Sequence, residues 1–252
     1  VNAIEVEGDF DLCQSMVKKA FNDAEINRKI ALTSANSINV ARWLPQMFYY
    51  FFAYKELKKF NKPIVISVPS GNFGNICAGL LAKKMGLPID HFIAATNIND
   101  VVPRYLKTSK YSPKSSIQTI SNAMDVGDPS NFIRISKIFN NNYNTIKSNL
   151  SGFKFEDNKT KEAIKEIYKD SNFIADPHGA VGYLGLKKYL KNHNGKIGVF
   201  METAHPIKFI DVVENTLDIK LKLPEKIKKI LKKEKKSTKI NNYEELKDYL
   251  IK

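Results

Sequence analysis

Two glycines and two asparagines form a short motif that could bind an anion. The motif Ser70-Gly-Asn-Phe-Gly-Asn75 separates an apolar, β-branched run from an apolar helical pattern. Glycine lets a backbone turn sharply and approach a ligand, and the amide groups at a helix start attract phosphate. The motif lacks both the lysine of a Walker loop and the GxGxxG spacing. From the pattern alone, a phosphate site and a tight strand-to-helix turn with asparagine capping are equal alternatives.

A second polar cluster precedes the most aromatic segment of the chain. It contains Asn36, Ser37 and Asn39 and is followed by Arg42. Such residues commonly cap helices, and capping alone would account for one or two of them. Amide and hydroxyl donors at a helix start, with a guanidinium one to two turns further on, could also hold an anion. The cluster is therefore a candidate for a second anion site.

Two histidines lie close to expected helix starts. Met201-Glu-Thr-Ala-His-Pro206 follows an expected strand, at the end where open α/β sheets place ligands. Helix capping by Thr203 and packing of His205 against Pro206 explain this motif equally well. His178 lies in the other motif, Pro177-His-Gly179. No nucleophile elbow accompanies either histidine, and the histidines and cysteines lack metal-ligand spacing, so neither a catalytic triad nor a metal site is supported.

The elements that must position these residues alternate between helix and strand. Strands are expected at 1–6, 64–68, 91–95 and 196–201. Helices are expected at 10–24, 40–60, 76–85, 133–150, 159–169, 177–190 and from 206 to 217. The aromatic helix 40–60 should be buried on most sides, and 97–131 should form a long loop with short helices. The order strand, glycine-rich turn, helix, strand predicts a βαβ unit with parallel strands.

The composition is that of a globular α/β protein of 252 residues with 43% hydrophobic residues. Of the net charge of +14, residues 219–252 contribute +7, from twelve lysines and five acidic residues. These lysines alternate with apolar residues at helical spacing, which indicates the solvated faces of terminal helices and argues against nucleic-acid binding. No apolar run is long enough to span a membrane. Cys13 and Cys77 share no CxxC spacing, so we expect buried free thiols and a cytosolic protein.

The order and wording of eight segments resemble threonine synthase, specifically its enterobacterial and fungal branch. The segments are Thr33–Asn39, Ser67–Asn75, Ala78–Lys83, Phe92–Asn97, Asp100–Arg104, Ser121–Val126, Asp176–His178 and Thr203–Pro206. They extend over nearly all of the chain before the basic end. The resemblance implies an α/β fold with a largely parallel, twisted sheet and flanking helices, which is the fold-type II, tryptophan synthase β-like fold of pyridoxal-phosphate-dependent enzymes.

The resemblance also implies a reaction and a set of site residues. The family converts O-phosphohomoserine and water to threonine and phosphate with pyridoxal 5'-phosphate. The cofactor stabilises carbanions at Cα and Cβ, phosphate leaves from Cγ, and water adds at Cβ. The residues expected to bind the cofactor are Gly71, Asn72, Phe73, Gly74, Asn75 and Thr203, with Thr203 at the pyridine nitrogen. The residues expected to bind the substrate phosphate are Asn36, Ser37, Asn39 and Arg42.

One departure from the family concerns the lysine that forms the Schiff base. In the family it lies upstream, in a Phe-Lys-Asp context that this chain does not contain. Because the chain also begins at Val1, within an expected strand, we interpret it as a carboxyl-terminal portion that is inactive by itself. A phospho-lyase on the same scaffold, and a non-catalytic binding protein that kept the fold, are the alternatives. We expect the protein to bind a small-molecule substrate and neither nucleic acid nor a membrane, and to be a monomer or a homodimer.

The resemblance further implies a division of the chain. Residues 1–45 would form the end of the small lobe, 46–218 most of the large cofactor-binding domain, and 219–252 a basic helical tail.

Overall fold

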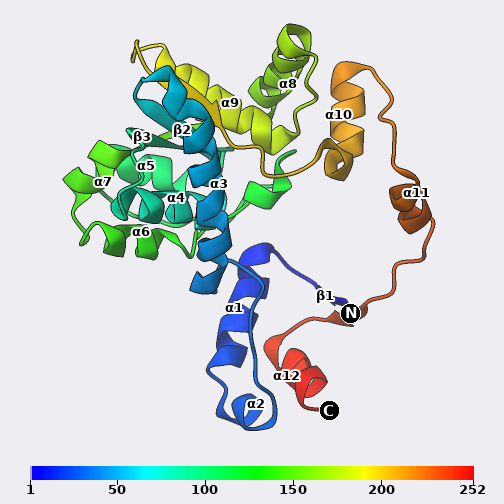
Figure 1. Ribbon diagram of the computed structural model, residues 1–252. Coiled ribbons are helices and arrows are strands. Elements are labelled where there is room, and N and C mark those ends of the chain that lie inside the picture. Colours follow the sequence, from blue (N-terminus) through cyan, green and yellow to red (C-terminus); the bar gives the residue numbers. More distant parts are fainter. Residues whose placement is uncertain (1) are drawn as a thin grey trace. The chain divides into compact units, whose positions relative to one another are not determined.

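The computed structural model describes residues 2–252, which form two compact units (Figure 1). One unit comprises Val1–Ser34, of which Val1 lies outside the described residues, together with Lys222–Lys252. The other comprises Ala35–Leu221 and contains every segment with a predicted site residue. None of the described helices is long and apolar enough to cross a membrane.

The larger unit is built on a parallel four-stranded sheet with the order β4-β3-β2-β5. Its strands are β2 (Ile64–Pro69), β3 (His91–Thr96), β4 (Leu150–Lys154) and β5 (Ile197–Phe200). In the centre, Val65 pairs with His91 and Pro69 with Ala95, so β2 and β3 end together. The predicted βαβ unit is confirmed, because α4 (Gly74–Lys84) connects these two parallel strands. The carboxyl ends of β2 and β5 therefore meet at one edge of the sheet.

Side-chain alternation along the strands gives the sheet two buried faces. Ile64, Ile66 and Val68 face a large core formed with α3 (Trp43–Leu57), α4, α5 (Val101–Thr108), α6 (Phe132–Ile138) and α7 (Tyr143–Asn149). Val65 faces the opposite side, against α9 (Pro177–Leu190), which in turn packs on α8 (Asp157–Ser171). Successive side chains of a strand point to opposite faces of the sheet, so a strand that is apolar throughout is buried on both faces. Helices thus cover both faces, as the sequence predicted (Figure 1).

Strand β4 was missed by the sequence analysis, which extended a helix through Leu150. The structure instead has two short helices, α6 and α7, and then Leu150–Lys154 as the edge strand beside β3. The segment lacks β-branched residues and contains Gly152, which is normally unfavourable in a strand. A methyl group at position 152 would lie 2.9 Å from Cα of Pro103, so close packing of α5 requires glycine there.

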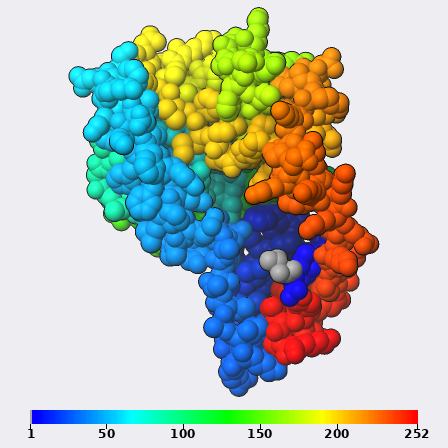
Figure 2. All heavy atoms as spheres, turned by 45° about the vertical axis from the view of Figure 1, so that its right-hand side comes forward, coloured from blue at the N-terminus to red at the C-terminus, as the bar shows by residue number. Residues whose placement is uncertain are grey.

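Helix α3 is less buried than its composition predicted. Trp43, Met47 and Tyr50 are buried, but Phe48, Tyr49 and Phe52 are 58%, 58% and 65% exposed. Figure 2 shows the light-blue segment that contains α3 at the surface of the molecule. The prediction of burial on most sides is therefore wrong for the described chain: one stripe of the helix faces the core. β5 is likewise half-buried, whereas the sequence predicted a buried strand.

The smaller unit joins the two ends of the chain. β1 (Ile4–Val6) pairs in parallel with β6 (Thr238–Ile240). Helix α1 (Phe10–Phe21), capped by Asp9, packs with α2 (Ala24–Lys29) and α12 (Tyr243–Ile251) around buried Met16, Ile26 and Ile240. The basic segment 219–252 therefore contains a strand as well as α11 (Glu225–Leu231) and α12, where the sequence predicted helices alone.

The two cysteines are free, as expected. Cys77 is buried in α4, and burial raises the pKa of its thiol. Cys13 is only partly buried.

Candidate active site

The candidate site begins where β2 ends and α4 starts. Phe73 occupies the N-cap position of α4 with a left-handed φ of 62°, and no side chain caps the helix. The first four amide groups of a helix lack partners within that helix, and the helix dipole adds a partial positive charge there. An α4 start without a side-chain cap is therefore suited to an anion. Left-handed φ is unfavourable for a bulky residue and is found most often at functional sites.

The two glycines of this loop are needed for a different reason from the one expected. We expected them to supply tight turning and access for a ligand, but the left-handed residue is Phe73. A methyl group at position 71 would lie 2.6 Å from Cα of Met124, and one at position 74 would lie 2.6 Å from Cβ of Ser37. Gly71 and Gly74 thus allow the loop to pack closely against two other segments of the chain.

Asn75 is fixed from α3. The hydroxyl oxygen of Tyr50 lies 2.7 Å from Oδ1 of Asn75 and 2.9 Å from its carbonyl oxygen, and it can donate to one of them at a time. Tyr50 is fully buried, and burial raises the pKa of its hydroxyl well above the ordinary value. The hydroxyl therefore remains protonated, and it orients the side chain of Asn75 in the first turn of α4.

The loop is joined to the second polar cluster through Ser37. Nδ2 of Asn72 donates to Oγ of Ser37 at 3.0 Å, and Nδ2 of Asn131 donates to the same oxygen at 3.2 Å. Oδ1 of Asn72 accepts from the amide and the hydroxyl of Ser130, at 2.7 and 2.9 Å. The side chain of Asn72 thus joins three segments of the chain.

Arg134 holds the segment that carries Ser37. It donates to the carbonyl oxygen of Ser37 at 2.8 Å and also to that of Ile38. Its Nη1 also donates to Oδ1 of Asn131 at 2.8 Å, and its Cζ lies 5.2 Å from the centroid of the Trp43 ring. A guanidinium with these partners fixes two backbone carbonyls at once, because its donors have a rigid geometry.

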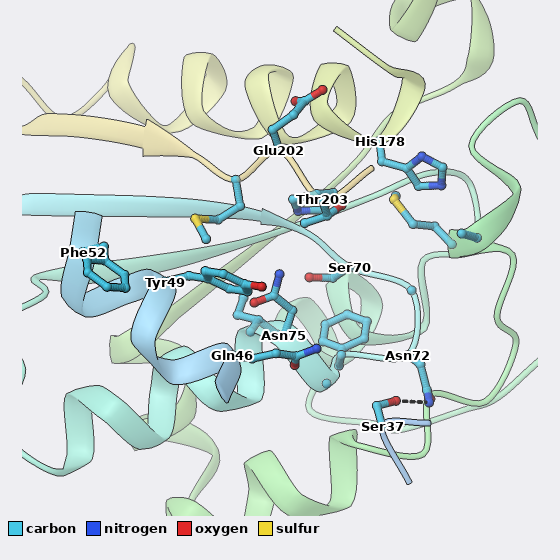
Figure 3. Close-up of a pocket in the computed structure, with 18 residues that line it drawn as sticks. Ser37, Gln46, Tyr49, Phe52, Ser70, Asn72, Asn75, His178, Glu202 and Thr203 are labelled. Carbon is cyan, nitrogen blue, oxygen red and sulfur yellow. Dashed lines mark hydrogen bonds between the residues drawn. The ribbon is translucent and has the colours of Figure 1, made fainter. Parts of the chain in front are cut away.

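These residues form one side of a cavity of about 520 Å³ (Figure 3). The β2–α4 loop faces the segment that follows β5, where Thr203 lies, and His178 lies at the start of α9 (Figure 3). The residues that line the cavity are Ser37, Gln46, Tyr49, Phe52, Pro69, Ser70, Gly71, Asn72, Phe73, Gly74, Asn75, Ile76, Ala123, Met124, His178, Met201, Glu202 and Thr203.

Two lining side chains carry a buried polar atom with no hydrogen-bond partner within residues 2–252. These atoms are Oε1 of Gln46 and Nε2 of His178. A buried polar atom without a partner is costly, so each is suited to a ligand or an ordered water. Together with the start of α4, they fit a ligand that carries a phosphate at one end and polar ring substituents elsewhere.

The structure brings together some predicted residues and separates others. Gly71 to Asn75, Thr203 and Ser37 all line the cavity, whereas Asn36, Asn39 and Arg42 do not. Asn36 accepts from the amide of Ile38, and Asn39 caps the short helix η1 (Val40–Arg42) by accepting from the amide of Ala41. Both asparagines therefore take part in the local capping that was the alternative explanation. Arg42 is exposed at the end of η1.

Four further residues of the site were missed by the sequence analysis. They are Gln46 on α3 and, just before and within α6, Ser130, Asn131 and Arg134. The three residues near α6 lie more than ninety positions along the chain from Ser37, so no local spacing relates them to it. Arginine is far less frequent than lysine in this chain, and that scarcity was a usable signal for Arg134.

Comparison with known proteins agrees with this geometry. Residues 1–201 match the family described as pyridoxal-phosphate dependent enzyme, and residues 179–250 match the family described as threonine synthase, C-terminal. Threonine synthase of Haemophilus influenzae is 43% identical over 254 residues, covering 100% of this chain and 59% of that protein.

Two solved structures are similar along the whole chain. The crystal structure of threonine synthase from Escherichia coli has a TM-score of 0.93 at 40% identity, covering 99% of this chain and 58% of the other. Pyridoxal-phosphate-bound threonine synthase from Brucella melitensis has a TM-score of 0.84 at 31% identity, covering 100% and 59%.

The fold and the cavity therefore define a fold-type II pyridoxal-phosphate enzyme. The chain belongs to the pyridoxal-phosphate-dependent enzyme family and, within it, to the threonine synthases. It spans somewhat less than two thirds of the length of these relatives.

Replacement of Arg134 by alanine tests the connection between the two polar segments. Loss of charge-assisted hydrogen bonds to two carbonyls should lower the free energy of unfolding by about 2 kcal/mol. Because Trp43 is the single tryptophan of the chain, its fluorescence emission should change as well. Arg104→Ala, which removes contacts with Asp100 and Ser112, is the control and should leave the emission unchanged. Unaltered stability and emission in Arg134→Ala would contradict this role.

Proposed function

We propose that the complete protein that contains this sequence converts O-phosphohomoserine and water to threonine and phosphate. The observation that carries the proposal is that the start of α4, without a side-chain cap, and Thr203 line one cavity. A phosphate held at the first and a ring nitrogen held at the second would fit pyridoxal phosphate at the carboxyl ends of β2 and β5. When bound, the cofactor supplies an electron sink for carbanions next to the amino group of the substrate.

The chain's own residues would bind and orient that cofactor. Backbone amides from Gly71 to Asn75 would donate to its phosphate, with the dipole of α4 adding to the attraction. The hydroxyl of Thr203 would meet the pyridine nitrogen. A neutral hydroxyl leaves that nitrogen unprotonated, whereas a carboxylate would stabilise its protonated form. Tyr49, Phe52 and Phe73 would give the cavity apolar walls.

The substrate phosphate is proposed to bind beside the cofactor, at the segment from Asn36 to Arg42. Ser37 supports this placement because it lines the cavity and is held by Asn72 and Asn131. Arg42 lies five residues further on and would neutralise the phosphate once the substrate is bound. Asn36 and Asn39 would maintain the turn through their caps.

The lysine that bonds to the cofactor is proposed to come from outside these 252 residues. Within residues 2–252, the residues that line the cavity include no lysine. The chain without such a lysine is therefore expected to be inactive. The division into 1–45, 46–218 and 219–252, the cytosolic location and the monomeric or homodimeric state are retained as part of the proposal.

The reaction itself can be tested with the complete protein. Supplied with pyridoxal phosphate and O-phosphohomoserine, it should release phosphate and threonine in equal amounts, and omission of the cofactor should abolish both. Release of neither product would contradict the proposal. Phosphate accompanied by ammonia and a keto acid, in place of threonine, would identify a phospho-lyase on the same scaffold.

Replacement of Arg42 by alanine tests the substrate-phosphate site. Loss of the guanidinium should raise KM for O-phosphohomoserine by about tenfold and leave the absorbance of the bound cofactor unchanged. Arg28→Ala removes another exposed arginine, outside the unit that contains the cavity, and should leave KM unchanged. Loss of cofactor absorbance in Arg42→Ala would mean that this arginine serves the cofactor phosphate instead.

A further inference from the structure

The segment that carries Thr203 is attached to α9 through its neighbour Glu202. The backbone amide of Asp176 donates to Oε1 of Glu202 at 3.1 Å. A methyl group at position 179 would lie 1.7 Å from Oε2 of Glu202, so a glycine at that position makes room for the carboxyl group. Although Glu202 lines the open cavity, its carboxyl end points toward α9 (Figure 3). The carboxyl group of Glu202 therefore contacts the first turn of α9, and Thr203 is the next residue along the chain.

The carboxyl group that Glu202 meets there is already charged. Oδ1 of Asp176 accepts from the backbone amide of His178 at 2.7 Å and lies 2.8 Å from its Nδ1. Asp176 is fully buried, and burial opposes its ionisation, but hydrogen bonds from His178 and Glu202 outweigh burial and lower the pKa of Asp176. The other oxygen, Oδ2, is buried without a hydrogen-bond partner in the described part of the chain.

Two carboxyl groups this close cannot both ionise at low cost. Glu202 is exposed as a residue, but its carboxyl end lies against the start of α9. Loss of solvation there, followed by the hydrogen bond and the negative charge of Asp176, raises the pKa of Glu202 to about 8. At neutral pH Glu202 therefore keeps its proton, and its side chain can donate to the carboxylate of Asp176. The titratable group in contact with Glu202 is Asp176, at the N-cap of α9. His178 pairs with Asp176, and His205 follows Glu202 on its own segment. The charge that acts on Glu202 is that of Asp176.

We propose that Glu202 is a positioning residue for Thr203, and that its protonated carboxyl group holds the Glu202–Thr203 segment on the first turn of α9. The inference rests on the proposed function, because it assigns Thr203 to the ring nitrogen of the cofactor. Ionisation of Glu202 would place a second negative charge beside Asp176 and loosen the segment. Cofactor affinity would then fall at alkaline pH although Thr203 does not titrate.

The protein without cofactor provides a first test. Because the pKa of Glu202 is raised on folding, its contribution to stability is full below its ordinary pKa and is lost as the pH rises through about 8. The unfolding temperature of the wild type should therefore fall more steeply than that of Glu202→Gln between about pH 6 and about pH 9. Glu162→Gln replaces an exposed glutamate of α8 and should retain the steeper fall of the wild type.

The affinity for pyridoxal phosphate, measured by equilibrium dialysis on the complete protein, provides the second test. Near pH 7, Glu202→Gln should bind like the wild type, because glutamine still accepts from the amide of Asp176. Near pH 9 the wild type should bind at least threefold more weakly than Glu202→Gln. A loss of this size corresponds to part of the net contribution of one hydrogen bond. Gly179→Ala, whose methyl group displaces the Glu202 carboxyl, should weaken binding about tenfold at either pH.

A matched control and the opposing outcomes complete the design. Gly182→Ala adds a methyl group to the same helix, 3.2 Å from Cδ of Pro69, a far less severe contact than the 1.7 Å contact at position 179, and should weaken binding much less than Gly179→Ala. Equal pH dependence in the wild type and Glu202→Gln, or wild-type affinity in Gly179→Ala, would overturn the inference. Failure of the wild type to bind pyridoxal phosphate at either pH would instead contradict the proposed function.

Discussion

The start of α4 imposes the constraint on which the rest of the site depends. A helix that begins a short loop after the buried end of β2 has its first residues in the wall of the cavity, and the residue at its N-cap is a phenylalanine without capping ability. Buried amides need partners, so this arrangement is stable when an anion or solvent supplies them. Phosphate is the anion that such a helix start holds most readily. Tyr50, through Asn75, fixes the first turn of the helix for that purpose.

Distant segments reach the same cavity because small residues permit close contact. Gly74 lets Ser37 approach, Gly71 lets Met124 approach, and Gly179 lets Glu202 approach. Arg134 and Asn131 then fix the segment of Ser37 through its backbone and its hydroxyl. Hydrogen bonds therefore connect the two proposed phosphate sites, so a substitution that moves one site should also move the other.

The sequence was sufficient for features that depend on local chemistry. Apolar runs predicted β2 and β3, and the glycine-rich turn between them predicted the βαβ unit. β4 was missed because its residues are poor strand formers that gain their pairing from β3. The burial of α3 was overestimated because the composition of a helix does not determine how many of its sides pack against other elements.

The residues of the candidate site also differ in how far the sequence could predict them. The loop from Gly71 to Asn75 was a candidate because it follows a strand, where parallel sheets place ligands, whereas Thr203 was assigned through the family resemblance. Both line the cavity. Arg134 and the Asp176–Glu202 pair were not found, because their partners are distant in sequence and only the folded chain brings them together. The motif in Asp176–His178 was recognised as a segment, but the pairing of its aspartate with Glu202 has no local signature.

A crystal structure of the complete protein with pyridoxal phosphate would test the central claim most directly, by locating the phosphate of the cofactor. The account predicts that its oxygens accept from the backbone amides between Gly71 and Asn75, at the start of α4. Phosphate density elsewhere, with those amides bonded only to water or to other parts of the protein, would contradict it.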